Sequence, residues 1–177
     1  MDTPIAEYNF RRSALERDRT YVLYPDRIEI EGAERPHVYP LSDVKGVRLK
    51  YEHTKQREYY QCLIDTKRGR INLRHVHWQS FAKFEDRRAT YTPFVKAVLV
   101  QLAEVPGVRF KAGSMVNFIS AIIGMPVMAG LVYLCASLGR TGLAVMAGFM
   151  FALCVWMVGP SRPRRLDPLA PPADLLP

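Results

Sequence analysis

The sequence predicts an α+β protein: an antiparallel sheet sandwich or small barrel capped by one amphipathic helix, followed by a two-helix transmembrane hairpin. Three observations support this prediction. Short segments of alternating apolar and polar residues recur between positions 20 and 76, a pattern typical of half-buried strands. The apolar period then changes to that of a helix, and two long uncharged runs follow.

The predicted strands are short and end at turn residues. Residues 20–24 and 27–31 form the first hairpin, with Pro25-Asp26 as its turn. The remaining predicted strands cover residues 37–39, 44–51, 60–64 and 71–74. Strands that recur at a spacing of about 8–12 residues indicate an antiparallel sandwich or small barrel.

Two segments beside the strands carry a weaker pattern. Residues 1–19 are predicted to be a basic N-terminal arm, which is either mobile or forms a short helix from about Ala6. Residues 77–90 are charged and lack a clear period, so we expect them to be irregular.

One amphipathic helix is predicted after the strands. Thr92 is a favourable N-cap, and Pro93 would occupy the first helical position. Pro106-Gly107 would end the helix after Glu104. The apolar stripe of this helix consists of Phe94, Val95, Val98, Leu99 and Leu102. By burying this stripe, the helix would cap the sheet and complete a domain at residues 20–113.

Two spans are predicted at residues 115–138 and 142–159, within a hairpin of residues 114–160. About 20 apolar residues in a helix cross a hydrocarbon core of about 30 Å. The connection between the runs is short, so the helices must turn back on each other. Small residues four apart let helix backbones approach closely. Residues of this kind are Ser120, Gly124, Ala144, Gly148 and Ala152.

Basic residues flank the predicted hairpin on both sides, whereas its turn carries only Arg140. The flanking residues are Arg109, Lys111, Arg162, Arg164 and Arg165. Because basic flanks stay on the cytoplasmic side, both termini are expected in the cytoplasm. The tail, residues 161–177, is rich in proline and expected to be extended. Its leucines could dock on the front domain or on a partner.

The order of these elements resembles the pleckstrin-homology-like (PH-like) domains of bacterial membrane proteins of unknown function. The resemblance covers about residues 20–105. It is carried by the opening hairpin at 21–32, the Pro40-Leu41-Ser42-Asp43-Val44 entry into the long strand, the Gly69 turn and the helix start at 91–95. It implies a PH-like fold, and we expect the protein in the bacterial inner membrane.

The net charge points to an anionic surface as a partner. The 177 residues include 25 Lys and Arg against 17 Asp and Glu, a net charge of +8. An anionic leaflet is a nearer partner for a membrane-anchored domain than nucleic acid, which we do not expect to bind. The candidate lipid-headgroup residues on loops of the sheet are Lys55, Arg57, Lys67, Arg68 and Arg70.

The sequence offers weak candidates for catalysis or metal binding. His75-x-His77 could place two imidazoles on one side of a strand, but no Cys or acidic residue accompanies them at ligand spacing. Glu85-Asp86 are adjacent in a charged segment, where solvated ion pairs are the ordinary interpretation. The three cysteines form no CxxC pair. We therefore expect no catalytic residue, metal or cofactor.

The favoured hypothesis is a non-enzymatic, membrane-anchored accessory module that holds a protein partner, a larger membrane complex or a second copy at the cytoplasmic face of the membrane. The alternative is a module that senses anionic lipids through the basic loops. Both follow from an anchored domain without a recognised catalytic motif.

Overall fold

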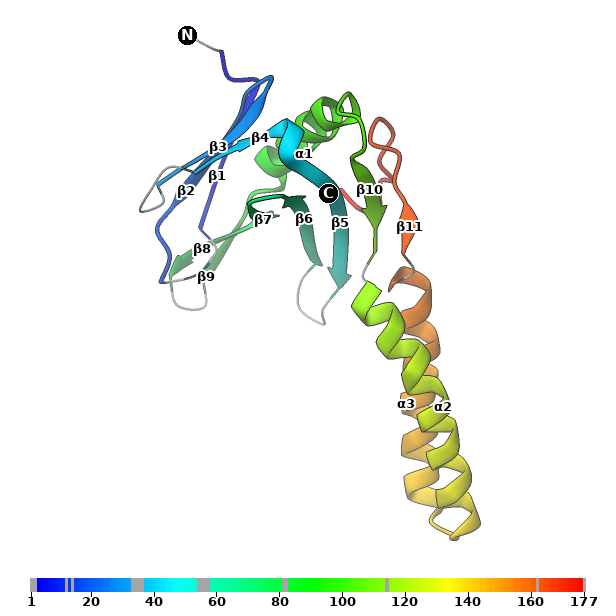
Figure 1. The fold of residues 1–177 in the computed structure, drawn as a ribbon. Helices are drawn as coiled ribbons and strands as arrows, with labels where there is room; N and C mark the ends of the chain where they lie inside the picture. Colours follow the sequence, from blue (N-terminus) through cyan, green and yellow to red (C-terminus); the bar gives the residue numbers. More distant parts are fainter. Residues whose placement is uncertain are drawn as a thin grey trace. The chain divides into compact units, whose positions relative to one another are not determined.

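The computed structural model of the chain describes residues 3–11, 13, 15–32, 37–53, 58–80, 83–113, 115–161 and 163–176. The chain divides into two compact units. The first contains Met1–Ala112 and Arg165–Pro177, and the second contains Gly113–Arg164. The first unit combines mostly antiparallel sheets with one α-helix, and the second consists of two α-helices (Figure 1). The mixed α+β class predicted from the sequence is confirmed.

The first sheet is antiparallel and follows chain order. Its strands are β1 (Ala6–Phe10), β2 (Arg19–Leu23), β3 (Arg27–Glu31) and β4 (His37–Pro40). The hairpin predicted around Pro25-Asp26 is the β2–β3 pair, in which Leu23 lies opposite Ile28. Ile28 and Ile30 are both buried, as their alternation with charged residues predicts.

The N-terminal segment differs from the predicted arm or short helix, because it contains β1. Tyr8 of β1 lies opposite Tyr21 of β2. Tyr8 and Phe10 are only 1% and 2% exposed. The alternation that marks this strand covers just five residues, and the dense arginines after it favour a solvated arm from the sequence alone.

The second sheet has the order β11-β10-β5-β6-β7. Its strands are β5 (Val44–His53), β6 (Glu58–Thr66), β7 (Gly69–Arg74), β10 (Arg109–Ala112) and β11 (Arg164–Arg165). β10 runs parallel to β5, and the other pairs along β5, β6 and β7 are antiparallel. The described strands form separate sheets and no closed barrel, so the barrel alternative is wrong.

A further hairpin occupies the segment expected to be irregular. It consists of β8 (Val76–Ser80) and β9 (Lys83–Asp86). Trp78 packs edge-on against Phe84 with ring centroids 4.6 Å apart. The Trp78 amide donates a hydrogen bond to the Arg11 carbonyl at 2.9 Å. The five residues between the two rings mix polar and apolar types without a regular alternation, so the sequence alone did not predict this hairpin.

The predicted amphipathic helix is α1 (Arg88–Ala103), and all five residues of its predicted stripe are buried. It begins about a turn earlier than Thr92, with Arg87 as its N-cap, so Pro93 lies inside the helix. The amide of Tyr91 donates to the Arg87 carbonyl and closes the first turn. The sequence misplaced the start because burial of Tyr91 outweighs the capping preference of Thr92.

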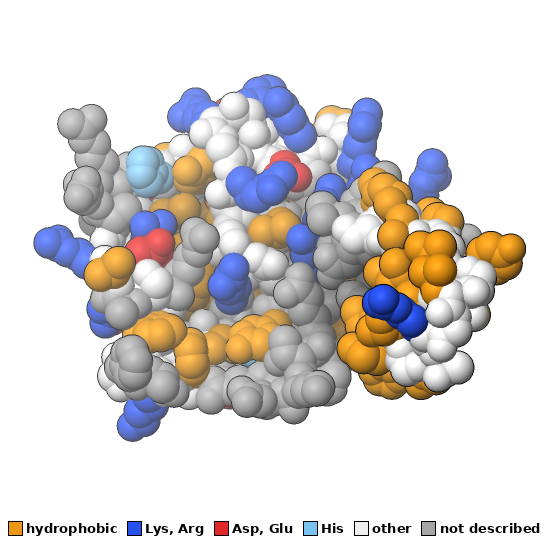
Figure 2. Space-filling model, turned by 90° about the horizontal axis from the view of Figure 1, so that it is seen from below, with side chains coloured by type: hydrophobic (Ala, Val, Ile, Leu, Met, Phe, Trp, Pro, Cys, Tyr) orange, Lys and Arg blue, Asp and Glu red, His pale blue; other side chains and the backbone are white. Residues whose placement is uncertain are grey.

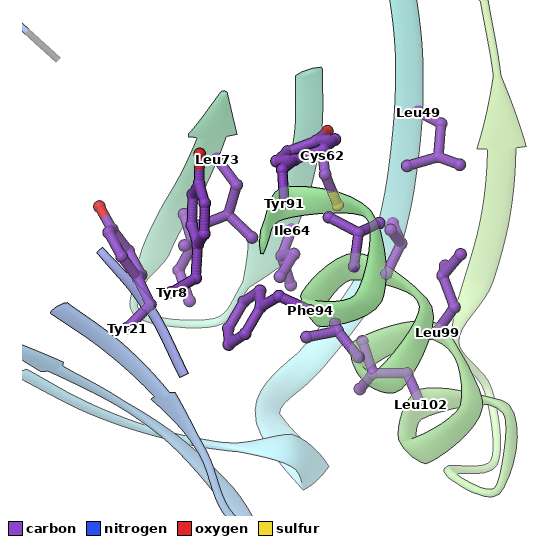
Figure 3. Close-up of a cluster of buried hydrophobic side chains, with 14 of the residues drawn as sticks. Tyr8, Tyr21, Leu49, Cys62, Ile64, Leu73, Tyr91, Phe94, Leu99 and Leu102 are labelled. Atoms are coloured by element: carbon purple, nitrogen blue, oxygen red, sulfur yellow. The ribbon is translucent and has the colours of Figure 1, made fainter. Parts of the chain in front are cut away.

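The core of the first unit lies between its sheets and α1. Figure 3 shows Tyr91, Phe94, Leu99 and Leu102 of α1 facing Tyr8 and Tyr21 of the first sheet and Cys62, Ile64 and Leu73 of the second. The C-terminal tail belongs to the same core, because Leu166, Leu175 and Leu176 are 5–6% exposed. The Leu166 amide donates to the Phe110 carbonyl of β10 at 3.2 Å.

The second unit is a pair of helices, α2 (Met115–Ser137) and α3 (Thr141–Ser161). They lie side by side and are joined by a turn in which Gly139 has φ +68° (Figure 1). A Cβ atom added to Gly124 of α2 would lie 3.2 Å from the Cys154 sulfur of α3, so the backbones approach closely there.

The length and apolarity of α2 are sufficient to cross a membrane, over Phe118–Ser137. Only 11% of that segment is buried within the described chain. The apolar stretch described in α3, Thr141–Trp156, is shorter. Large apolar side chains of both helices are exposed, and hydrophobic side chains form much of the helix surface seen in Figure 2.

Candidate functional site

The predicted headgroup residues on the β6–β7 turn are held by acidic neighbours. Lys67 Nζ and Arg68 Nε each lie 3.2 Å from a carboxylate oxygen of Asp43. The Arg70 guanidinium donates to Asp65 at 2.5 Å. Lys67, Arg68 and Arg70 are exposed, so their ion pairs are weak. These pairs still offset part of the positive charge around the turn. The other two candidates, Lys55 and Arg57, lie outside the described residues.

A second basic cluster, which the sequence assigned only to membrane flanks, lies on the second sheet. Arg109 and Lys111 are two apart on β10 and both are exposed. In the register with β5, Arg109 lies beside Gly46, and Lys111 lies beside Arg48. Neighbouring residues in adjacent strands share a face of the sheet, so these side chains converge.

A hollow of about 100 Å³ is lined by four basic side chains, those of Lys45, Arg48, Arg109 and Lys111. The remaining lining residues are Gly46, Val47 and Asp65. Gly46 lies between Arg109 and Asp65 in the register, so its missing side chain leaves the space open. A Cβ atom there would lie 2.9 Å from the Arg109 carbonyl oxygen, and glycine is therefore also needed for β10 to pair closely with β5. We refer to this hollow as the basic pocket.

Of the other predicted membrane-flanking residues, Arg164 and Arg165 form β11, the neighbour of β10, and both are exposed. Arg162 lies outside the described residues. The strands that lead into α2 and out of α3 are thus adjacent in one sheet. The sequence could not show this, because more than 50 residues separate them.

A cavity of about 160 Å³ is lined by residues of both larger sheets, from β1 to β4 of the first and from β7 of the second. Its apolar lining comes from Phe10, Tyr21, Ile30, Tyr39 and Ile71. Its polar lining comes from Glu16, Arg19, His37, Arg70 and Asn72. We call this cavity the inter-sheet cleft. It combines aromatic surface with polar side chains, which suits an extended segment that carries apolar side chains.

The two histidines considered as metal ligands serve the backbone. Nδ1 of His75 accepts the Tyr60 amide at 3.0 Å, and Nδ1 of His77 accepts the Arg11 amide at 2.9 Å. Both rings are buried. Burial lowers the pKa of His75 and of His77, and the Arg87 charge lowers the pKa of His77 further. Within the described residues, no three His, Cys, Asp or Glu side chains are grouped as metal ligands.

The acidic pair and the domain cysteine are also held in structural contacts. Glu85 accepts hydrogen bonds from Arg87 and Gln79, which lower its pKa. Asp86 pairs with Arg88 at 3.0 Å. Burial raises the pKa of the Cys62 thiol to about 12, so it is protonated at neutral pH and a poor nucleophile.

The contact between α2 and α3 is offset by one residue from parts of the predicted small-residue stripe. Gly124, Ala144 and Gly148 are partly buried, whereas Ser120 and Ala152 are exposed. Ala121 and Ala147 are the buried alanines, at 5% and 4% exposure. Helical spacings of three and four alternate along a packed seam, so a strict spacing of four drifts off it.

Comparison of the chain with protein-family models, curated proteins and solved structures found no significant match.

Proposed function

We propose that the chain is a non-enzymatic, membrane-anchored binding module. In this proposal α2 and α3 cross the bacterial inner membrane as a hairpin, and the first unit, a PH-like domain, holds a protein partner at the cytoplasmic face. The observation that carries the proposal is a long apolar helix that the protein itself leaves uncovered.

Lipid is the solvent that such a helix surface requires. Burying one large aliphatic or aromatic side chain is worth about 1.5–3 kcal/mol. Exposed examples include Ile123 and Val127 of α2 and Val145, Phe149 and Trp156 of α3, at 57–73% exposure. An ordinary core helix would be mostly buried. A hairpin in lipid gains this free energy without any further protein contact.

The second span and the orientation are inferred from length and charge. α3 contains 21 residues, which at 1.5 Å per residue gives about 31 Å. Arg109 and Lys111 precede α2, and Arg164 and Arg165 follow α3. Basic residues at both outer ends favour cytoplasmic termini.

The inter-sheet cleft is the proposed contact for the partner. Among the described strands, β4 and β7 each have one edge without a neighbour in their sheets, and an extended segment can add to such an edge. Of the two roles left open for the tail leucines, docking on the front domain or on a partner, Leu166, Leu175 and Leu176 adopt the first, because they are buried in the core of the first unit.

Site-specific photocrosslinking in cells tests this function. A photoreactive side chain at Tyr39, in the cleft, is expected to give one discrete crosslinked protein in the membrane fraction. The same group at Lys96, exposed on α1, is the matched control and should give none. Recovery of the full chain as an uncrosslinked monomer from both positions, or its release from membranes by carbonate, would contradict the proposal.

A further inference from the structure

We propose that the basic pocket binds the phosphate of acidic phospholipid headgroups in the leaflet beside α2. The occupant is thus an anionic lipid, held by Lys45, Arg48, Arg109 and Lys111. This inference rests on the membrane anchoring proposed above, but not on the protein partner or on the inter-sheet cleft.

The register of the second sheet concentrates positive charge on one face. One row across the strands reads Arg109, Gly46, Asp65 and Arg70, and the next reads Lys111, Arg48, Leu63 and Asn72. Asp65 is the sole acid in these two rows, and Arg70 engages it. The charge of this face is therefore concentrated at the β10 and β5 end, around the pocket.

The four cations of the basic pocket have no acidic partner among the described side chains. No described Asp or Glu lies within ion-pair distance of Lys45, Arg48, Arg109 or Lys111, although Asp65 lines the same pocket. By contrast, Lys67 and Arg68 share Asp43. Lys and Arg side chains also predominate over Asp and Glu on the face drawn in Figure 2. An anion entering the pocket thus displaces no existing ion pair, whereas one at the β6–β7 turn must compete with Asp43.

The short connection between β10 and α2 keeps the basic pocket close to the membrane surface. Lys111 precedes the first residue of α2, Met115, by four residues. At no more than about 3.6 Å per residue, the chain holds Lys111 within about 15 Å of that helix end. Such a tether keeps the pocket at a high effective concentration of headgroups. Each cation near an acidic surface gains about 1 kcal/mol, or roughly fivefold in binding.

Lysine acetylation of the full chain in lipid nanodiscs tests the inference, because Lys45 and Lys111 report on the pocket directly. The discs contain phosphatidylcholine alone or with phosphatidylglycerol. We expect the acetylation rates of both lysines to fall at least about fivefold in the acidic discs. Lys96, exposed on α1, should react equally in both. Added salt should restore the rates of Lys45 and Lys111.

Two matched variants separate the pocket from net charge. Arg48→Gln/Arg109→Gln keeps both reporter lysines and should abolish most of their protection. Arg17→Gln/Lys83→Gln removes the same charge at exposed positions elsewhere in the first unit. This variant should retain the protection of Lys45 and Lys111. Unchanged thermal unfolding of both variants establishes that they fold.

Equal acetylation of Lys45 and Lys111 in neutral and acidic discs would overturn the inference. So would protection by inorganic phosphate or a duplex oligonucleotide in neutral discs without any effect of acidic lipid. A chain that remains outside the discs would refute the anchoring as well, whereas failure of the pocket alone leaves the incorporated chain intact.

Discussion

At the scale of single residues, the hydroxyl groups of two buried tyrosines differ in what they contribute to the stability of the fold. Tyr8 OH donates to the Arg74 carbonyl at 2.6 Å and so ties β1 to the end of β7. Tyr91 OH is buried and has no hydrogen-bond partner among the residues that the structure describes. Burial raises the pKa of both phenols. Their rings pack edge to face at 5.8 Å, so they share one environment.

Removing these hydroxyls should therefore have opposite effects on stability. Tyr8→Phe is expected to cost about 1 kcal/mol, because it leaves the Arg74 carbonyl without its donor. Tyr91→Phe is expected to be neutral or stabilising by up to about 1 kcal/mol. Chemical unfolding of the full chain in mild detergent measures both. A larger loss for Tyr91→Phe than for Tyr8→Phe would contradict this account.

The buried histidines make stability depend on pH. Their folded pKa values lie below the unfolded value of 6.5, so the unfolded chain binds protons more readily. Their contribution is complete above about pH 6.5 and is lost as the pH falls towards the folded values. Glu58, Asp86 and Arg88 surround His75, and the charges around His77 are Arg11, Asp18, Glu85 and Arg87.

We expect the free energy of unfolding to fall between about pH 7 and about pH 5. His75→Gln/His77→Gln should flatten that decline, since a glutamine oxygen can still accept the backbone amides without titrating. Unfolding curves of both proteins across this range provide the measurement. Parallel declines in the two proteins would assign the effect to other groups.

At the scale of elements, α2 and α3 depend on one close approach. The backbone at Gly124 faces the Cys154 sulfur, whereas a Cβ atom at Gly130 would meet nothing within 4 Å. Gly124→Leu should force the helices apart and destabilise the pair by about 1–3 kcal/mol. Gly130→Leu adds the same side chain to α2 on an open face and should not. Unfolding of each variant with increasing denaturing detergent measures the difference in the stability of the helix pair.

The tail is the second element whose packing can be tested. Leu175 and Leu176 are buried in the core of the first unit, whereas Leu169 is 71% exposed. Leu175→Ala or Leu176→Ala is expected to cost about 2–5 kcal/mol. Leu169→Ala should change stability by less than about 0.5 kcal/mol. Thermal unfolding that ranks Leu169 with the other two would show that the tail does not pack as described.

At the scale of the whole molecule, the chain completes its first unit only after α3. β10 and β11 are neighbours in one sheet, although the second unit separates them in the sequence. Adjacent strands lie about 4.8 Å apart, so a short linker can replace the second unit. The first unit then retains both β11 and the tail leucines.

Excision of residues 114–162, with a short Gly-Ser linker in their place, is therefore expected to give a folded protein that needs no detergent. The full chain should require detergent, because its apolar helices remain uncovered. Truncation at residue 113, which removes β11 and the tail as well, should give a less stable product. Gel filtration and circular dichroism distinguish the three proteins. Full-chain monomers in plain buffer would contradict the membrane proposal.

The sequence alone determined features that depend on neighbours in the chain. Ile28 and Ile30 alternate with charges, so burial of one face predicted their strand. The stripe of α1 and the apolarity of α2 follow equally from local period and composition. Each of these patterns is read within one element, and no distant residue is needed to interpret it.

Tertiary structure alone decided which distant residues meet. The parallel pairing of β10 with β5 places Lys111 beside Arg48, and no local pattern encodes that register. Asp43 holds Lys67 and Arg68 across 24 and 25 positions, which shifts the candidate anion site from the β6–β7 turn to the basic pocket. The physical reason is that strand pairing and ion pairing between distant segments are selected by burial and charge in the completed fold.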